Sequence, residues 1–228
     1  AEAAADLEAG PLFDTPPLTS SGEAVVVWLH GFGDTGEQWS RTAPALQQMG
    51  LPMLRFLFPT APVRSTGVGS RGPCRSWYDV ESLNPDEIAQ QQGPPHGLLE
   101  SVDYILGLVE PHVKRGVHPS RIILAGYSQG GGLALAAALR APRPIGGVLM
   151  LSSWVAEPLP AGAARGVPVH MFHGAADPVV PVAAAQQTSA MLRAAGIDGS
   201  FRAYEGMTQG LCDEEVADLS QTLYTLLH

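Results

Sequence analysis

The sequence has few cysteines. Only Cys74 and Cys212 occur in its 228 residues, and they lie far apart in the chain. Two cysteines cannot build a disulfide framework, and a metal site would need further His or Cys residues clustered near them. We therefore interpret them as two unrelated thiols, and we expect neither a metal site nor a cofactor.

Positive charge is also scarce. Thirteen Lys and Arg residues stand against 22 Asp and Glu residues, which gives a net charge of -9, and Lys114 is the only lysine. This balance argues against a basic surface for nucleic acid or an anionic membrane. No apolar run reaches the roughly 20 residues of a membrane-spanning helix, and residues 1–10 lack the apolar core of a signal peptide. We expect a cytoplasmic protein with no nucleic-acid partner and no membrane span.

What the chain does contain is typical of one folded domain. Hydrophobic residues make up 45% of the sequence and charged residues 15%, and a chain of this length can bury a single sizeable core. Residues 1–22 are small, acidic and proline-containing, and they predict an extension that lies over the surface before the first strand. Residues 23–228 then form the predicted domain.

Short apolar runs alternate with longer amphipathic stretches along this domain. The runs predict buried strands, and the stretches between them predict helices. This alternation is typical of an α/β fold with a mostly parallel central sheet flanked by helices. The predicted strands are residues 24–30, 53–58, 122–127, 147–152, 167–173 and 200–204. The predicted helices are one that ends near residue 49, one over 97–115 with a kink before Pro111, one over 183–195 and a closing helix from about 213.

The most informative stretch is Gly126-Tyr127-Ser128-Gln129-Gly130, which joins a predicted strand to a predicted Ala/Leu-rich helix. This is the G-x-S-x-G pattern of a nucleophile elbow in the strand-turn-helix context that the elbow requires. Gly126 and Gly130 leave room where the strand and the helix approach closely. The turn predicts that the Ser128 hydroxyl stands above the sheet, beside backbone N–H groups that favour an oxyanion.

Two further turns follow predicted strands. The first strand ends in His30-Gly31-Phe32-Gly33, a glycine-rich turn that leaves backbone N–H groups free to point at a ligand; we interpret His30 as a structural residue of this turn. A later strand ends in His173-Gly174 and reaches Asp177, which lies 49 positions after Ser128. An acid after a late strand suits the chain order Ser, Asp, His of an α/β hydrolase. Residues 61–76 form a glycine-rich loop that is either a cap over an acyl pocket or a solvated connection.

Four segments together resemble the acyl-protein thioesterase / lysophospholipase-like carboxylesterase family, a branch of the α/β hydrolases. They are residues 30–36 (HGFGDTG), 59–62 (PTAP) with 76–79 (SWYD), 126–131 (GYSQGG), and 173–181 (HGAADPVVP). The resemblance extends from about residue 24 to the C-terminus. It implies an α/β-hydrolase fold and cofactor-free hydrolysis of carboxylic esters or thioesters.

The resemblance also implies roles for individual residues. Ser128 is the expected nucleophile and Asp177 the expected acid, and the amides of Phe32 and Gln129 are the expected oxyanion-hole donors. We further place Gly31 and Trp77 at the substrate-binding surface. The expected partner is an acyl ester or thioester on a small molecule, a lipid or an acylated protein. An exposed apolar surface would suit either an acyl chain or a homodimer.

One position departs from the family pattern. The last family motif reads Gly-Met-x-His-Ser, in which the histidine is the general base, whereas this chain reads Gly206-Met207-Thr208-Gln209-Gly210. A serine hydroxyl needs a base to take its proton, and an amide is not basic near neutral pH. Gln209 would still be able to donate a hydrogen bond to Asp177 and accept one from Ser128. We therefore predict a hydrolase whose turnover is impaired.

Three explanations of Gln209 stay open at this point. The glutamine is a replacement made to trap a complex, or it is native in a protein that binds acyl ligands or a protein partner without turnover, or another histidine reaches Ser128. His173 is the best-placed histidine for the third explanation, although its position at a strand end favours a structural role. A peptidase or lipase use of the elbow is a weaker alternative, because the chain leaves little room for a lid domain.

Overall fold

The computed structural model of the chain describes residues 8–64, 72–160, 162–163 and 166–228. A seven-stranded sheet crosses this part of the molecule in the order β1-β3-β2-β6-β7-β8-β9. All neighbouring strands are parallel except β1 and β3, which are antiparallel, so the predicted α/β class is confirmed. The strands of this sheet are β1 (Gly10–Thr15), β2 (Ala24–Leu29), β3 (Leu54–Thr60), β6 (Ile122–Tyr127), β7 (Gly147–Leu151), β8 (Val169–Gly174) and β9 (Gly199–Tyr204).

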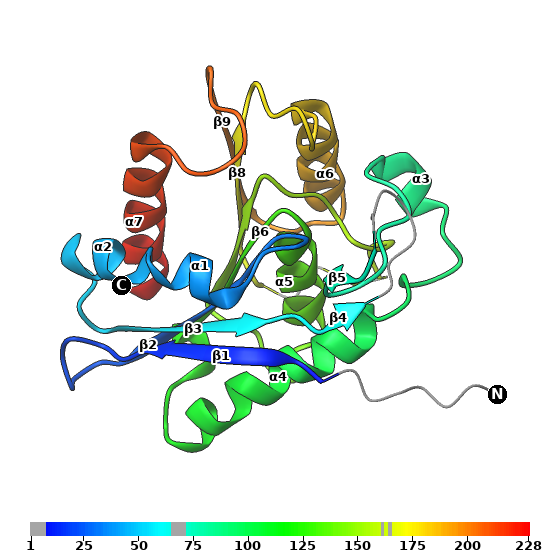
Figure 1. Ribbon diagram of the computed structural model, residues 1–228. Coiled ribbons are helices and arrows are strands. Elements are labelled where there is room, and N and C mark those ends of the chain that lie inside the picture. The colour runs from blue at the N-terminus through cyan, green and yellow to red at the C-terminus, as the bar shows by residue number, and fades with distance from the viewer. Residues whose placement is uncertain (1–7, 65–71, 161, 164–165) are drawn as a thin grey trace.

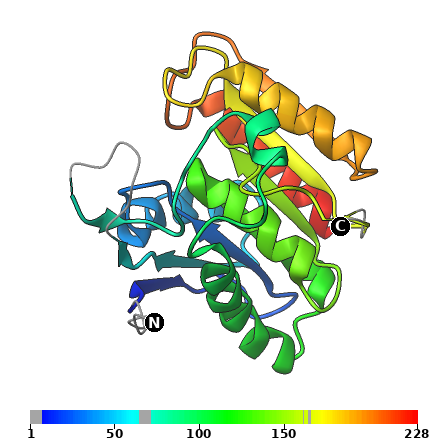
Figure 2. The ribbon, with the colours of Figure 1, turned by 90° about the vertical axis from the view of Figure 1, so that its right-hand side faces the viewer.

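Helices cover both faces of the sheet, as Figures 1 and 2 show. Helices α1, α2 and α7 lie on one face, and α4, α5 and α6 lie on the other. The central strands β2, β6 and β7 are buried at every position, which explains their unbroken apolar runs. The helices are α1 (Gly36–Ser40), α2 (Ala43–Gln48), α3 (Pro85–Ala89), α4 (Leu98–Lys114), α5 (Gln129–Arg140), α6 (Val182–Ala194) and α7 (Asp213–Leu227), with a short 3-10 turn at Pro119–Arg121.

The two faces of the sheet contribute to two hydrophobic clusters. One cluster joins β2 and β6 to α4 and α5 through residues such as Leu124 and Leu133. The other joins the opposite faces of the same strands to α2 and α7 through Trp28, Phe56 and Leu219. Helix α4 continues through Pro111, where the sequence had suggested a kink.

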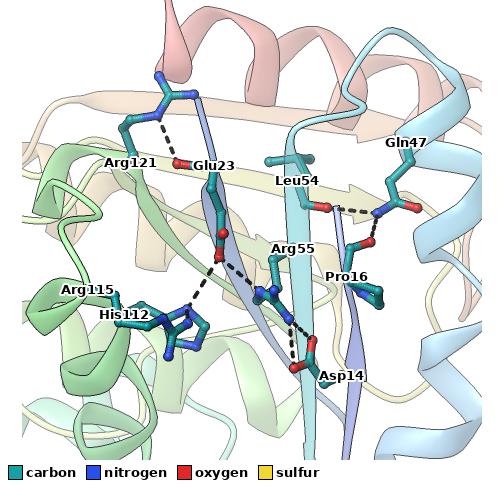
Figure 3. A network of polar contacts seen from close by, with 9 residues as sticks. All are labelled: Asp14, Pro16, Glu23, Gln47, Leu54, Arg55, His112, Arg115 and Arg121. Carbon is teal, nitrogen blue, oxygen red and sulfur yellow. Dashed lines mark hydrogen bonds and ion pairs between the residues drawn. The ribbon is translucent and has the colours of Figure 1, made fainter. Parts of the chain in front are cut away.

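The N-terminal segment departs from the prediction. Residues 10–15 do not lie over the surface before the first strand; they form edge strand β1, which pairs with β3 and brings Phe13 opposite Phe58. Polar contacts hold this edge, as Figure 3 shows. The Arg55 guanidinium on β3 contacts Asp14 at 2.7 Å and Glu23 at 2.9 Å. Ion pairs between distant segments produce no periodic pattern in the sequence. The sequence of residues 1–22 therefore did not predict strand β1.

Helix α2 anchors the chain that leaves β1. The side-chain amide of Gln47 is buried and donates hydrogen bonds to the carbonyls of Pro16, at 2.9 Å, and Leu54, at 2.8 Å (Figure 3). One glutamine thus ties the segment after β1 to the start of β3.

The glycine-rich loop 61–76 contains a small two-stranded ribbon. Strand β4 (Val63–Arg64) pairs antiparallel with β5 (Cys74–Arg75). The part of this loop at residues 65–71, which includes two of its glycines, lies outside the described residues, and so do residues 1–7 of the N-terminal extension. The ribbon continues into residues 76–79, which reach the sheet beside α5.

Candidate active site

The turn at Ser128 has the geometry of a nucleophile elbow. Ser128 has φ 52° and ψ −120°, a conformation that non-glycine residues rarely adopt and that costs about 1–3 kcal/mol. The surrounding glycines are required by space. A Cβ at Gly126 would overlap the backbone of Gly130, and a Cβ at Gly130 would overlap the Leu29 carbonyl at the end of β2. The strained turn is therefore held between two strands and the start of α5.

Backbone and side-chain hydrogen bonds hold this turn from both sides. The Ser128 N–H donates to the carbonyl of Leu151 on β7 at 2.8 Å. The Ser128 carbonyl accepts from the Ser153 hydroxyl at 2.7 Å and from the Gly131 N–H at 3.0 Å. The Ser128 residue itself is only half-buried, so its position is fixed while its side chain stays within reach of solvent.

The glycine-rich turn after β2 lies directly against the elbow. A Cβ at Gly31 would come within 3.4 Å of Ser128 Cβ and 3.1 Å of Tyr127 Cδ1. Among the described residues, the backbone N–H groups of Phe32 and Gln129 have no hydrogen-bond acceptor. Gln129 is the first residue of α5, so its N–H also lies at the positive end of that helix. Two free N–H donors beside a serine hydroxyl suit an anionic oxygen.

His30 has a structural environment. Its Nδ1–H donates to the Gly31 carbonyl at 2.7 Å, and its Nε2 accepts from the Ala61 N–H at 2.9 Å. Both ring nitrogens are therefore occupied in the neutral form. Burial lowers the pKa of His30, although the hydrogen bond to Gly31 and nearby Asp34 oppose that shift. These contacts agree with the interpretation that His30 holds the turn.

Trp77 lies beneath the site and not at its surface. Its side chain is fully buried, and its indole N–H donates to the His30 carbonyl at 2.9 Å. The prediction that Trp77 contacts a substrate does not match this position, whereas Gly31 does border Ser128. Trp77 has a packing role, because its ring lies against the His30 ring at a centroid distance of 4.9 Å with a tilt of 38° between the ring planes.

The Gln129 side chain connects the elbow to the same aromatic segment. It is completely buried. Its Oε1 accepts from the Trp77 N–H at 3.0 Å, and its Nε2 donates to the Ser76 hydroxyl at 2.9 Å and to the Tyr78 carbonyl at 2.7 Å. Both N–H donors and the carbonyl oxygen of the side-chain amide thus have partners within the protein. These bonds hold the residue that carries one of the two free N–H donors.

Asp177 is placed by the loop after β8. Its Oδ1 accepts from the N–H groups of Val179, at 2.8 Å, and Val180, at 3.0 Å. Its side chain is not exposed, and its Oδ2 has no hydrogen-bond partner among the described residues. One oxygen therefore orients the carboxylate, and the other is left for a further donor.

His173 lies close to Asp177 but forms no hydrogen bond with it. The distance from His173 Nε2 to Asp177 Oδ2 is 3.8 Å. The Nε2–H instead donates to the Val180 carbonyl at 2.8 Å, and Nδ1 has no partner in the described part of the chain. Burial lowers the pKa of His173, with opposing effects from the Val180 hydrogen bond and from Asp177. This histidine is buried at the strand end, as the structural interpretation predicts.

The loop that carries Gln209 is hydrogen-bonded to segments next to Asp177 and Ser128 in the chain. On one side, the Ala176 N–H donates to the Met207 carbonyl at 3.0 Å, next to Asp177. On the other side, the Gly210 N–H donates at 3.0 Å to the side-chain hydroxyl of Tyr127, the residue that precedes Ser128 in the chain. Position 209 is thus bracketed by the neighbours of the expected nucleophile and the expected acid.

Gln209 itself makes no such connection. The residue is exposed, and no hydrogen bond joins its side chain to Ser128, Asp177 or any other residue that the structure describes. The suggested amide bridge from Asp177 to Ser128 is therefore not formed in this structure.

Three residues near the site were missed in the sequence. Ser153 holds the Ser128 carbonyl, Tyr127 holds the Gly210 N–H, and Glu215 of α7 is completely buried with neither carboxyl oxygen hydrogen-bonded among the described residues. Burial raises the pKa of Glu215 to about 8. Of these three residues, only Glu215 could have been noticed in the sequence, as an acid on the apolar face of an amphipathic helix. Asp213 and Glu214 directly precede it, so it looked like one more acidic residue of the first helical turn.

The fold and the elbow together define the α/β-hydrolase class. Comparison with known proteins narrows this class, because the model of the phospholipase/carboxylesterase family matches residues 18–227. The chain therefore belongs to the phospholipase/carboxylesterase family. The resemblance noted in the sequence is thus confirmed.

Individual relatives agree with this assignment. Acyl-protein thioesterase 1 of Gibberella zeae is 32% identical over 218 residues, which cover 91% of this chain and 92% of the relative. A probable carboxylesterase of Oryza sativa subsp. japonica is 34% identical over 204 residues, or 86% of each chain. The crystal structure of Zea mays acyl-protein thioesterase 2 matches with a TM-score of 0.78 at 26% identity and covers 96% of this chain and 100% of that one.

Within the described ranges, no group of three or more His, Cys, Asp or Glu residues is arranged to hold a metal ion. No helix in the same ranges is both long and apolar enough to span a bilayer.

Proposed function

We propose that this chain is a serine hydrolase scaffold for carboxylic esters or thioesters in which the general base is replaced by Gln209. Ser128 is the nucleophile and Asp177 is the acid that would orient an imidazole. The N–H groups of Phe32 and Gln129 stabilise the oxyanion that forms when the serine attacks the acyl carbonyl. We also propose that the chain, with Gln209 in place of the base, turns over its substrate at a strongly reduced rate.

The observation that carries this proposal is the bracketing of position 209. The Met207 and Gly210 contacts tie this loop to the loop of Asp177 and to Tyr127, which directly precedes Ser128. A histidine at this position would be able to reach both functional groups from one backbone site. The unpaired Oδ2 of Asp177 supports the same arrangement, since it is the oxygen that would receive an imidazole N–H.

The reduced turnover follows from acid–base chemistry. A serine hydroxyl has to lose its proton as it attacks, and the amide of Gln209 cannot accept that proton near neutral pH. Removal of the histidine from a serine triad lowers kcat by about 10⁶, and the remaining rate comes from the oxyanion hole and from substrate binding. The loss is thus expected in the chemical step and not in binding.

The substrate class follows from the relatives. Their names describe acyl-protein thioesterases and carboxylesterases, and we propose an acyl ester or thioester for this chain as well. The exposed side chains of Phe32 and Val179 beside the site would suit an apolar acyl group.

The test is hydrolysis of p-nitrophenyl esters from acetate to palmitate by the chain as it stands and by Gln209→His. Each is measured against its own Ser128→Ala blank, which removes background hydrolysis. We expect Gln209→His to raise kcat by about 10³- to 10⁶-fold, with a much smaller change in KM.

The outcomes separate the possible functions. If Gln209→His folds and hydrolyses no ester above its Ser128→Ala blank, the hydrolase scaffold is disproved, and binding of acyl ligands or of a protein partner becomes the better explanation. If the chain as it stands is already as active as Gln209→His, the base lies elsewhere in the chain. His173→Ala is then the variant that identifies or excludes the nearest histidine.

A further inference from the structure

The starting point is the unequal use of the two carboxylate oxygens of Asp177. Oδ1 accepts two backbone N–H groups, from Val179 and Val180. Oδ2 is buried and has no hydrogen-bond partner among the described residues. The nearest ring nitrogen, His173 Nε2, is 3.8 Å away and donates its proton to the Val180 carbonyl. A buried carboxylate oxygen without a donor is unfavourable, so a ligand that donates a hydrogen bond to it is favoured.

Gln209 does not occupy this oxygen, and nothing described in the structure holds its side chain. It is exposed and forms no hydrogen bond within the described part of the protein. Moving it aside therefore breaks no described interaction. Its backbone remains tied on both sides through Met207 and Gly210, so displacement of the side chain leaves the loop in place.

The chemistry of the proposed acid, Asp177, and the proposed nucleophile, Ser128, selects the ligand. It has to donate an N–H to Asp177 Oδ2, and it has to take a proton from Ser128 near neutral pH. A lysine ammonium or a guanidinium has donors but no acceptor, a carboxylate has acceptors but no donor, and an amide is not basic. A neutral imidazole has one N–H, one acceptor nitrogen and a pKa near neutrality.

We propose that Asp177 and Ser128 form a binding site for an imidazole supplied from outside the chain, and that hydrolysis depends on this imidazole. The source is either free imidazole or the histidine side chain of an acylated peptide. This inference rests on the proposed function, because it uses the same nucleophile and the same oxyanion donors.

The reaction balances with imidazole as a base that is regenerated. Its free nitrogen takes the Ser128 proton as the Oγ–C bond forms, and the imidazolium returns that proton to the leaving alkoxide or thiolate as the acyl–O or acyl–S bond breaks. Imidazole then takes a proton from water as the water oxygen attacks the acyl-serine. The imidazolium gives it to Ser128 Oγ as the ester bond breaks, and the carboxylic acid is released.

The experiment measures hydrolysis of an octanoyl thioester by the chain as it stands while imidazole is titrated. A thioester is chosen because imidazole itself attacks p-nitrophenyl esters readily. The Ser128→Ala protein gives the rate to subtract at each imidazole concentration. We expect a Ser128-dependent rate that saturates with imidazole and rises at least about 10-fold, within the range of general base catalysis. Its pH profile rises towards pH 7 as imidazole becomes neutral.

Two controls test the role of Asp177. 1-Methylimidazole has a similar basicity but no N–H, so it cannot donate to Oδ2, and we expect it to give less than about a tenth of the imidazole-dependent rate. Asp177→Asn replaces one carboxylate oxygen by an NH₂ donor and should remove the stimulation. Asp103→Asn changes an exposed carboxylate on α4 and should leave the stimulation intact.

A second arm distinguishes the two sources of imidazole. Two S-octanoyl-cysteine peptides are compared, one with a histidine next to the acylated cysteine and one with alanine in its place, without free imidazole. Faster hydrolysis of the histidine peptide identifies a substrate-supplied base. Stimulation by free imidazole alone limits the site to small imidazoles.

The results also separate this inference from the proposed function. If Gln209→His hydrolyses the thioester but neither imidazole nor the histidine peptide accelerates the unaltered chain, the imidazole site is disproved and the proposed function stands. Equal stimulation by imidazole and 1-methylimidazole likewise disproves it, because the N–H would then serve no purpose. If Gln209→His is also inactive, the proposed function fails with it.

Discussion

The Ser153 hydroxyl donates a hydrogen bond of 2.7 Å to the carbonyl of Ser128. That carbonyl belongs to the same planar peptide as the Gln129 N–H, and in a trans peptide the C=O and N–H point in opposite directions. The bond from Ser153 thus orients the Gln129 N–H towards the opposite side of the peptide. A donor has to be in place before charge develops on the acyl oxygen. If the Gln129 N–H is an oxyanion donor, as we propose, Ser153 is a positioning residue for it.

The first prediction concerns Ser153→Ala in the Gln209→His background. Loss of one neutral hydrogen bond is worth about 1 kcal/mol, so we expect kcat to fall about 5- to 10-fold while KM changes less than about 2-fold. Binding of an acyl trifluoromethyl ketone, which forms an oxyanion, should weaken in the same proportion as kcat. Ser220→Ala is the matched control, since that buried serine donates to the Met49 carbonyl on α2's side of the sheet. A parallel loss in both variants would show a general stability effect.

The second prediction concerns the bond between Tyr127 and Gly210. Tyr127→Phe removes the oxygen that accepts the Gly210 N–H at 3.0 Å. Burial raises the pKa of Tyr127 to about 12, so the hydroxyl stays neutral throughout an ordinary assay range and pH does not complicate the comparison. We expect the free energy of unfolding to fall by about 1 kcal/mol and amide hydrogen exchange at residues 207–212 to accelerate. Tyr224→Phe alters an exposed tyrosine, and unchanged exchange in both proteins would contradict the anchoring role.

The third prediction compares two Gly→Ala substitutions. A Cβ at Gly130 would overlap the Leu29 carbonyl, which belongs to the backbone of a central strand and cannot move aside. We expect Gly130→Ala to lower the free energy of unfolding by more than about 3 kcal/mol. Gly107 lies inside α4 and has no atom within 4 Å of its added Cβ, so Gly107→Ala should stabilise the protein by about 0.5–1 kcal/mol. Denaturant unfolding measures both, and two changes of the same sign would contradict the packing argument.

The sequence predicted the parts of the fold that depend on local pattern. Buried parallel strands produce unbroken apolar runs, so β2, β6 and β7 could be located to within one residue. The elbow at Ser128 could be predicted because glycine is required where this strand and helix meet. The two glycines concerned, Gly126 and Gly130, lie within a few residues of Ser128 in the sequence.

Features that depend on contacts between distant segments were not predictable in the same way. Strand β1 is held by pairing with β3 and by the Arg55–Asp14 ion pair, and neither contact has a period in the sequence. Trp77, the expected substrate contact, is instead fully buried, and its backbone N–H donates to the Gln129 side chain of α5. The roles of Ser153 and Tyr127 depend on which carbonyl or N–H each hydroxyl meets, and that information exists only in the folded chain.

The last prediction concerns Glu215, whose carboxyl group is completely buried without a hydrogen-bond donor in the described part of the structure. Burial, and then the charge of Asp218, raise its pKa from 4.5 to about 8, against an opposing effect of the Cys212 backbone. Between these two pH values the folded protein holds a proton that the unfolded chain releases, so the free energy of unfolding falls as pH rises and becomes level above about pH 8. Glu215→Gln keeps the shape but cannot ionise, and it should remove this slope and stabilise the protein at pH 9 by about 5 kcal/mol, with little change at pH 4. Denaturant unfolding at both pH values tests this expectation, and Glu214→Gln, which alters an exposed neighbour paired with Arg202, is the control. Parallel pH profiles for the unaltered protein and Glu215→Gln would show that the buried carboxyl is ionised in the fold.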